Sequence, residues 1–257
     1  MKRIMLGAVA LAAIGAAPAL AADLPARVYT KAPPVAAQIY DWTGFYIGIN
    51  GGFGASNKCW GITNNLGVPV APAAAEGCSN GFGGVAGGQV GYRWQRSALV
   101  FGVEAQGDWA RLRGSSSSQF FGGPAVNQST VTAFGLFTGQ VGYAVNNILM
   151  YVKGGAAVTA DKYAGLVAPA SAAFDQASET RWGGALGVGF EYGMTPNWTV
   201  AVEYDHLFMG TASNNFSSTG LNAPVGAFSR TDSIGQNVDM LTARVNYRFG
   251  GPVIAKY

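Results

Sequence analysis

Asp205 and His206 are the pair in this sequence that most resembles catalytic machinery, because an acid that orients a histidine is a recurring part of hydrolytic sites. The residues around them alternate between apolar and polar types, which predicts a β-strand, and neighbours in a strand face opposite sides of a sheet. The sequence places neither a serine nor a second acid to complete a site with this pair. We therefore expect no enzymatic activity, and we place His206 at an outer rim of the fold.

A glycine-rich stretch could suggest phosphate binding. Gly81–Gly91 reads GFGGVAGGQVG, and a phosphate-binding loop of this type needs a following helix whose N-terminus holds the phosphate. The residues that follow have the alternation of another strand. The stretch is better interpreted as small residues on a crowded sheet wall, and no cofactor is expected.

Cys59 and Cys78 are the only cysteines. Together with His206, the single histidine, they do not supply the four ligands of a structural metal site. The remaining interpretations are a disulfide, favoured if the chain is exported, and two free thiols.

Ten ionisable residues, five acids and five bases, lie on the polar face of the segments in which apolar and polar residues alternate. Glu191 and Glu203 could be paired carboxylates for acid–base chemistry, but with five basic neighbours salt bridging is the stronger hypothesis. The predicted charge network comprises Arg93, Glu104, Asp108, Lys153, Arg181, Glu191, Glu203, Asp205, Arg244 and Arg248.

These residues lie on eight segments in which apolar and polar residues alternate with a period of two. Each places apolar and aromatic residues on one face and polar residues on the other. They span about 42–53, 82–94, 99–112, 130–143, 148–159, 180–192, 198–208 and 236–249.

The connections between the segments alternate in length. Three are tight turns and four are long stretches rich in Ser, Asn, Ala, Gly and Pro, an arrangement typical of an outer-membrane barrel. The turns are 95–98, 144–147 and 193–197, and the long connections are 54–81, 113–129, 160–179 and 209–235.

The scarcity of charge decides which face meets solvent. Only 11% of the residues are charged, and a solvated exterior of eight strands would need more charge than this. A narrow lumen needs few charges and needs them paired, because an unpaired buried charge is costly. The charged face is therefore predicted to point inward and fill the lumen; the alternative is an exposed charged face.

Aromatic residues gather at the ends of the predicted strands, as in the two girdles of a membrane barrel. One group is expected at the periplasmic end: Trp42, Phe45, Tyr92, Trp94, Tyr143, Phe190, Tyr192, Trp198, Tyr247 and Phe249. The second group is expected near the opposite rim: Phe53, Phe82, Trp109, Trp182 and Phe208.

The N-terminus has the pattern of a secretory signal peptide, with Lys2 and Arg3 before an apolar run and a small-x-small cleavage site at residues 19–21. Export favours a disulfide between the cysteines. The predicted organisation is a signal peptide at 1–21, a periplasmic linker at 22–41, a barrel at 42–250 and a periplasmic tail at 251–257.

Three motifs resemble a known family. They are ADLP at residues 22–25, YDWTGFY at 40–46 and VNYRF at 245–249. In these the chain is similar to the small outer-membrane β-barrels of alphaproteobacteria, often called outer-membrane immunogenic or porin-like proteins. The resemblance implies an OmpA/OmpX-type barrel, insertion by the barrel-assembly machinery and contact with lipopolysaccharide. It also implies a C-terminal aromatic assembly signal, either Phe249 or Tyr257.

The sequence thus predicts an all-β fold, a closed eight-stranded antiparallel transmembrane β-barrel with long extracellular loops and short periplasmic turns. The expected location is the bacterial outer membrane. The expected function is structural, supporting envelope integrity and surface interaction through the loops, with outer-membrane lipid and lipopolysaccharide as partners and no nucleic acid. The alternative is a small-solute, porin-like channel.

Overall fold

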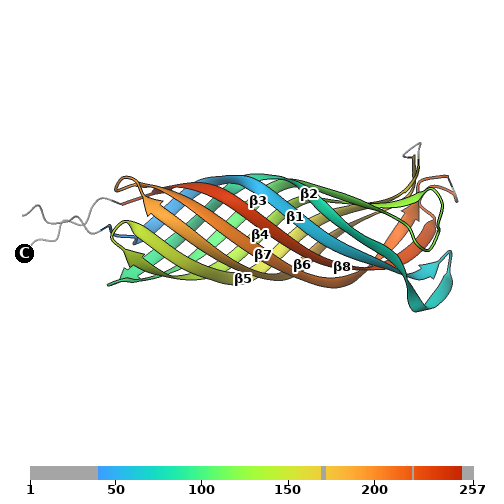
Figure 1. The fold of residues 1–257 in the computed structure, drawn as a ribbon, viewed down its shortest axis with the longest axis horizontal. Coiled ribbons are helices and arrows are strands. Elements are labelled where there is room, and N and C mark those ends of the chain that lie inside the picture. The colour runs from blue at the N-terminus through green and yellow to red at the C-terminus, as the bar shows by residue number, and fades with distance from the viewer. Residues whose placement is uncertain (1–39, 169–171, 222, 251–257) are drawn as a thin grey trace, which may run out of the picture. The chain divides into compact units, whose positions relative to one another are not determined.

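A computed structural model describes residues 40–168, 172–221 and 223–250. The predicted signal peptide, most of the linker and the tail at 251–257 lie outside these ranges. The described chain forms eight antiparallel strands (Figure 1). Their bounds are β1 Gly44–Asn65, β2 Val68–Arg96, β3 Leu99–Ser117, β4 Ala125–Val145, β5 Ile148–Val167, β6 Ala172–Gly193, β7 Trp198–Ser218 and β8 Phe228–Arg248.

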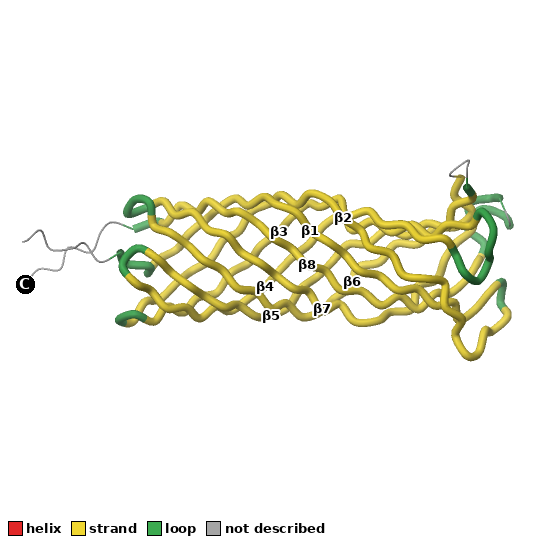
Figure 2. The backbone as a smooth tube through the Cα atoms, viewed as in Figure 1, coloured by secondary structure: helices red, strands yellow, loops and turns green. Residues whose placement is uncertain are grey.

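The sheet closes on itself, which confirms the predicted eight-stranded barrel. Each strand pairs with the next in the chain, and β8 pairs back onto β1 from Tyr46↔Arg248 to Asn65↔Arg230. Three tight turns join strands at one end, here called the turn end, and four hairpins join strands at the other, here called the hairpin end (Figure 2). Closure leaves no free edge strand, so the backbone inside the apolar band can pair as a wall within hydrocarbon requires.

The strands are much longer than predicted, between 19 and 29 residues. Most residues of the four predicted long connections belong to strands. At the hairpin end, the residues between consecutive strands are only 66–67, 118–124, 168–171 and 219–227. The prediction gave too much weight to Ser, Asn, Ala and Gly as breakers. Strand preference depends on context, and small polar residues remain in a strand when both neighbouring strands supply hydrogen bonds.

The outward face is apolar over one band of the barrel. Trp198 and Phe208 mark its two edges on β7, and their ten-residue separation corresponds to about 26 Å at ~40° of tilt. Ile49, 70% exposed, and Trp109, 78% exposed, show how open this face is. A band of this height matches the apolar belt of a membrane barrel. Among the residues described, no helix is long and apolar enough to cross a membrane.

Trp42 departs from the prediction that it belongs to the girdle at the turn end. It precedes β1 and is 1% exposed, packed with Val100, Leu149 and Tyr151. Its main-chain N–H donates to Oε1 of Gln95 at 2.7 Å. The chain turns inward before the first strand begins, so this indole covers the lumen instead of meeting lipid.

Val131 is a second correction, because it was predicted on the outward face of its strand and is instead buried in the lumen. The register shifts between Val131 and Ala133 on one side of β4, and between Trp109 and Leu112 on the neighbouring strand. The extra residue on β4 reverses which face the side chains on either side of it occupy, whereas β3 keeps its alternation through the shift.

Pairing between β6 and β7 is interrupted within the wall. β6 and β7 pair from Gly193↔Thr199 to Gly184↔Phe208, and then pair again only at Gln176↔Ser217 and Asp175↔Ser218. The strands are not paired across this seam at residues 177–183 and 209–216. The seam begins at the edge of the apolar band, at Trp182 and Phe208, and continues toward the hairpin end.

Candidate functional site

The interior of the barrel is the candidate site, since it holds all ten residues of the predicted charge network. None of the ten is more than 6% exposed. Eight strands leave a lumen that side chains can fill.

The centre of this network is Arg244. Its guanidinium lies 2.8 Å from Oε1 of Glu104 and also contacts the carboxylate of Glu203. The Nζ atom of Lys153 lies 2.6 Å from Oε1 of Glu203, 3.1 Å from Oδ1 of Asp205 and 3.5 Å from Oε1 of Glu104. Two cations and three acids from four strands thus form one buried group.

Arg93 and Glu191 form a second pair nearer the turn end, 2.7 Å apart. The ring of Tyr46 lies beneath Arg93, and its hydroxyl donates to Glu104 at 2.6 Å. This ring lies flat against the wall at Gly91, where a Cβ atom would come within 2.4 Å of the tyrosine oxygen. A glycine is therefore required at that position.

Three predicted members are held by partners outside the predicted set. Arg248 donates to the main-chain carbonyls of Thr43 and Pro196. Asp108 accepts from Gln106 at 2.8 Å. Arg181 pairs with Glu179 at 2.7 Å and donates to carbonyl groups of neighbouring strands. These contacts fill the lumen but do not belong to the group around Arg244.

Beyond this network, a layer of apolar side chains crosses the lumen. Sequence reasoning missed it because it expected a polar interior throughout. Leu112, Leu136, Leu207 and Val238 are each 0% exposed, and Met240 is 1% exposed. Such a layer has no polar group to carry water or ions.

A second set of ion pairs, also missed, lies beyond the apolar layer. Lys58 lies 2.6 Å from Oδ1 of Asp161. At the mouth of the hairpin end, Arg230 lies 2.6 Å from Oε2 of Glu76 and 3.0 Å from Oδ2 of Asp175, and all three are 0% exposed. The signal was present, because alternation continues through 54–62 and 230–240, but those residues were assigned to loops.

Asp232 belongs to the same mouth cluster but is less well satisfied. Its Oδ2 atom lies 3.3 Å from Arg230, whose N–H groups point to Glu76, Asn127 and Asp175 instead. Neither carboxylate oxygen of Asp232 has a hydrogen-bond partner in the structure. The residue lies well outside the apolar band. Burial, with added repulsion from the two other acids, raises the pKa of Asp232 to about 7.

β8 contributes a residue to every layer of the lumen, because every second residue along the strand points inward. From the turn end these residues are Arg248, Asn246, Arg244, Thr242, Met240, Val238, Gln236, Ile234, Asp232 and Arg230. Around Ile234, the buried rings of Trp60, Tyr163 and Phe216 form an aromatic layer. The lumen is therefore filled by polar, apolar, polar, aromatic and polar layers along its length.

Cys59 and Cys78 form a disulfide on the outer face of the barrel. They are direct cross-strand partners of β1 and β2, so the bond staples a paired hairpin and not the loop that was predicted there.

Replacing both cysteines with serine is expected to lower the free energy of unfolding by about 3 kcal/mol, because the bond closes a loop across 19 positions of the unfolded chain. Denaturant unfolding of the C59S/C78S variant measures this, and reductant should produce a similar loss in the wild type. Two free thiols found by non-reducing mass spectrometry of the mature protein would contradict the pairing.

His206 faces outward at the edge of the apolar band. Its Nδ1 atom lies 2.7 Å from Oδ1 of Asp239, which also accepts from the hydroxyl of Tyr204 at 2.5 Å. Asp205, its neighbour in sequence, points into the lumen as expected. The next outward residue on β7 is Phe208, so no nucleophile stands beside the pair there. Within the described ranges, no group of three or more His, Cys, Asp or Glu could hold a metal ion.

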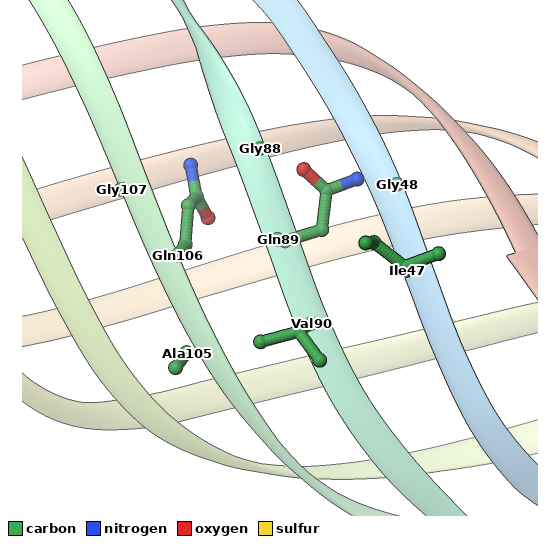
Figure 3. Close-up of a pocket in the computed structure, with 8 residues that line it drawn as sticks. All are labelled: Ile47, Gly48, Gly88, Gln89, Val90, Ala105, Gln106 and Gly107. Carbon is green, nitrogen blue, oxygen red and sulfur yellow. The ribbon is translucent and has the colours of Figure 1, made fainter.

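The membrane-facing wall also has shallow hollows where glycines replace side chains. Figure 3 shows one of about 430 Å³ across β1, β2 and β3, where Ile47 and Val90 border Gly88 and Gly107. It presents no charged group. Its two polar lining residues, Gln89 and Gln106, are buried, so the hollow suits packing by lipid chains better than solute binding.

Comparisons with known proteins agree with this geometry. The sequence model of a family described as outer membrane protein beta-barrel domain matches residues 7–249. The 31 kDa outer-membrane immunogenic protein of Brucella melitensis is 32% identical over 217 residues, covering 82% of this chain and 88% of that protein. The 22 kDa outer membrane protein of Rhizobium leguminosarum is 29% identical over 191 residues, covering 74% and 71%.

A solved structure shares the fold. The outer membrane protein OprG of Pseudomonas aeruginosa superposes with a TM-score of 0.52 at 14% sequence identity, covering 83% of this chain and 99% of that one.

Proposed function

Because the chain belongs to the outer membrane protein β-barrel domain family, we propose that it is a structural barrel with a sealed lumen that supports the envelope and carries an extended surface outside the cell. Its location is the outer membrane.

The observation that carries the proposal is the filled interior. A solute passing through would have to displace the ion group around Arg244 and the apolar layer around Leu136 and Val238. Open channels are formed by much larger barrels, generally with about 16 strands. The small-solute channel remains the competing function, and the continuous packing weighs against it.

Purified protein reconstituted in a planar lipid bilayer is expected to give no steady conductance. The physical reason is that the apolar layer offers no partner for a hydrated ion, and the cations of the charged layers are already paired with acids of the lumen. A general porin inserted in the same bilayer is the positive control. Discrete, long-lived current steps from this protein would instead favour the channel.

Surface interaction is the second part of the proposal, supported by the length of the strands at the hairpin end. β7 continues for ten residues beyond Phe208, about 26 Å if the tilt is maintained. Outer-membrane lipid and lipopolysaccharide are the partners that we propose for this wall. The barrel-assembly machinery is the proposed partner of the C-terminal strand β8. Phe249 directly follows this strand, and its N–H donates to the carbonyl of Phe45 on β1.

A further inference from the structure

Three cationic side chains face outward from the barrel at one level, beside one another. Arg111 and Arg113 lie on β3, and Lys162 lies on β5; all three are exposed. Arg113 pairs with Thr130, and Thr130 pairs with Lys162, so Arg113 and Lys162 occupy one row across three neighbouring strands. The Cα atoms of Arg113 and Lys162 are therefore about 10 Å apart. Arg111 lies two residues before Arg113 on the same face of β3. The three cations are here called the basic row.

This basic row lies just beyond the outer girdle of the apolar band. Arg111 and Arg113 follow the exposed Trp109 by two and four residues on the same face, and Arg113 pairs with the girdle residue Phe82. Lipid headgroups begin at this level. Of the acids in the described strands, the one that faces outward near this level is Asp239, on β8, where His206 and Tyr204 already contact it.

A polar recess of about 530 Å³ continues from the row onto the β6–β7 seam. The recess borders the stretch where pairing of β6 and β7 is interrupted, between Gln176↔Ser217 and Gly184↔Phe208. Hydroxyl and amide side chains cover its outward side. Its lining is Lys162, Tyr163, Gln176, Ala177, Ser178, Asn215 and Ser217.

We propose that the basic row and this recess together bind the phosphorylated saccharide of a lipopolysaccharide molecule in the surrounding leaflet. Arg111, Arg113 and Lys162 would hold its phosphate groups, and Ser178 and Asn215 would hydrogen-bond its sugar hydroxyls. The inference rests on the proposed function in one respect, namely that the hairpin end faces out of the cell.

The chemistry of the two parts fits this ligand and no single simpler one. Arginine and lysine are the residues that bind phosphate, and at this level they meet the phosphorylated glycolipid of the outer leaflet. The neutral hydroxyls and amides of the recess match sugar hydroxyls, which donate and accept hydrogen bonds alike. A peptide strand inserted in the seam is disfavoured, because Arg181 already spans it with a bond of 3.3 Å to the carbonyl of Gly210.

The first experiment measures binding of fluorescently labelled rough-type lipopolysaccharide to the full-length mature barrel in detergent. The R111Q/R113Q/K162Q variant is expected to bind at least tenfold more weakly than the wild type, and added salt should weaken wild-type binding because the charges are exposed. R96Q is the matched control, since Arg96 is an exposed cation at the turn end. Heat-dependent electrophoretic mobility verifies that each variant folds. Unchanged binding by the folded triple variant would overturn the proposal.

The second experiment separates a phosphosaccharide from any anionic lipid. S178A/N215A is expected to weaken lipopolysaccharide binding severalfold while leaving binding to phosphatidylglycerol micelles unchanged. Equal wild-type affinity for both lipids, or no effect of S178A/N215A on lipopolysaccharide, would overturn the saccharide part. Conductance is measured in a separate experiment. An open pore would refute the sealed barrel but would leave the lipopolysaccharide-binding result unchanged.

Discussion

Replacing Arg244 with methionine is expected to lower the free energy of unfolding by about 3–5 kcal/mol. The variant leaves the carboxylates of Glu104 and Glu203 with Lys153 as their remaining cation, inside the filled lumen. Removing one partner of a buried ion group costs much more than the net value of the pair, because the charge left behind stays desolvated.

Urea unfolding in phospholipid vesicles, followed by the fluorescence of the chain's tryptophans, measures this loss. Arg96→Met is the matched control: Arg96 is exposed at the turn end, so we expect a change within about 0.5 kcal/mol. Arg244→Lys keeps the charge but loses the planar guanidinium, so its loss of unfolding free energy is expected to lie between zero and that of Arg244→Met. A loss below about 1 kcal/mol for Arg244→Met would show that the lumen is hydrated.

Asp232→Asn should have the opposite effect and stabilise the protein at pH 8, by about 2–4 kcal/mol. Because the folded pKa of Asp232 is raised to about 7, the folded state binds a proton that the unfolded chain, with its ordinary carboxyl pKa, has released. The folded state therefore binds more protons between about pH 4 and pH 7, and the contribution of Asp232 to stability falls as the pH rises through this window. Asparagine cannot ionise, so it avoids the cost.

The difference in stability between Asp232→Asn and the wild type is therefore expected to be small at pH 4 and to grow toward pH 8. Asp175→Asn is the control within the same cluster. Asp175 accepts from Arg230, from Ser229 and from the main chain of Gly165, so its neutralisation should destabilise the protein at both pH values. A pH-independent difference for Asp232→Asn would contradict the raised pKa.

The sequence was sufficient to predict the closed barrel, the number of strands and which face points inward. Alternation carries this information, because a period of two places every second side chain on one face. Arg93, Lys153 and Arg244 could be assigned to the lumen for that reason, and the scarcity of charge decided that the apolar face meets lipid.

Local irregularities limited the rest of the prediction. Val131 was placed on the wrong face because a register shift cannot be seen in a single strand's pattern; it depends on how two strands pair. Lys58 and Arg230 were missed because turn-forming residue types outweighed a weak alternation. Trp42 was misplaced because the strand begins later than its aromatic motif suggested.

The apolar layer was missed for a different reason. Residues such as Leu136 and Val238 look outward-facing in composition, and only their position in the register assigns them to the lumen. The contact of His206 with Asp239 was also outside the reach of the sequence, because 33 residues separate them.

The passage of β8 through every interior layer has a consequence for biogenesis. This strand brings both Arg230 and Arg244, the guanidinium groups around which acids from β2, β3, β6 and β7 gather. A nascent barrel that lacks its last strand therefore carries an excess of negative charge in a wet, half-open groove. Docking of the C-terminal strand therefore brings both guanidinium groups to these acids in the same event that closes the ring.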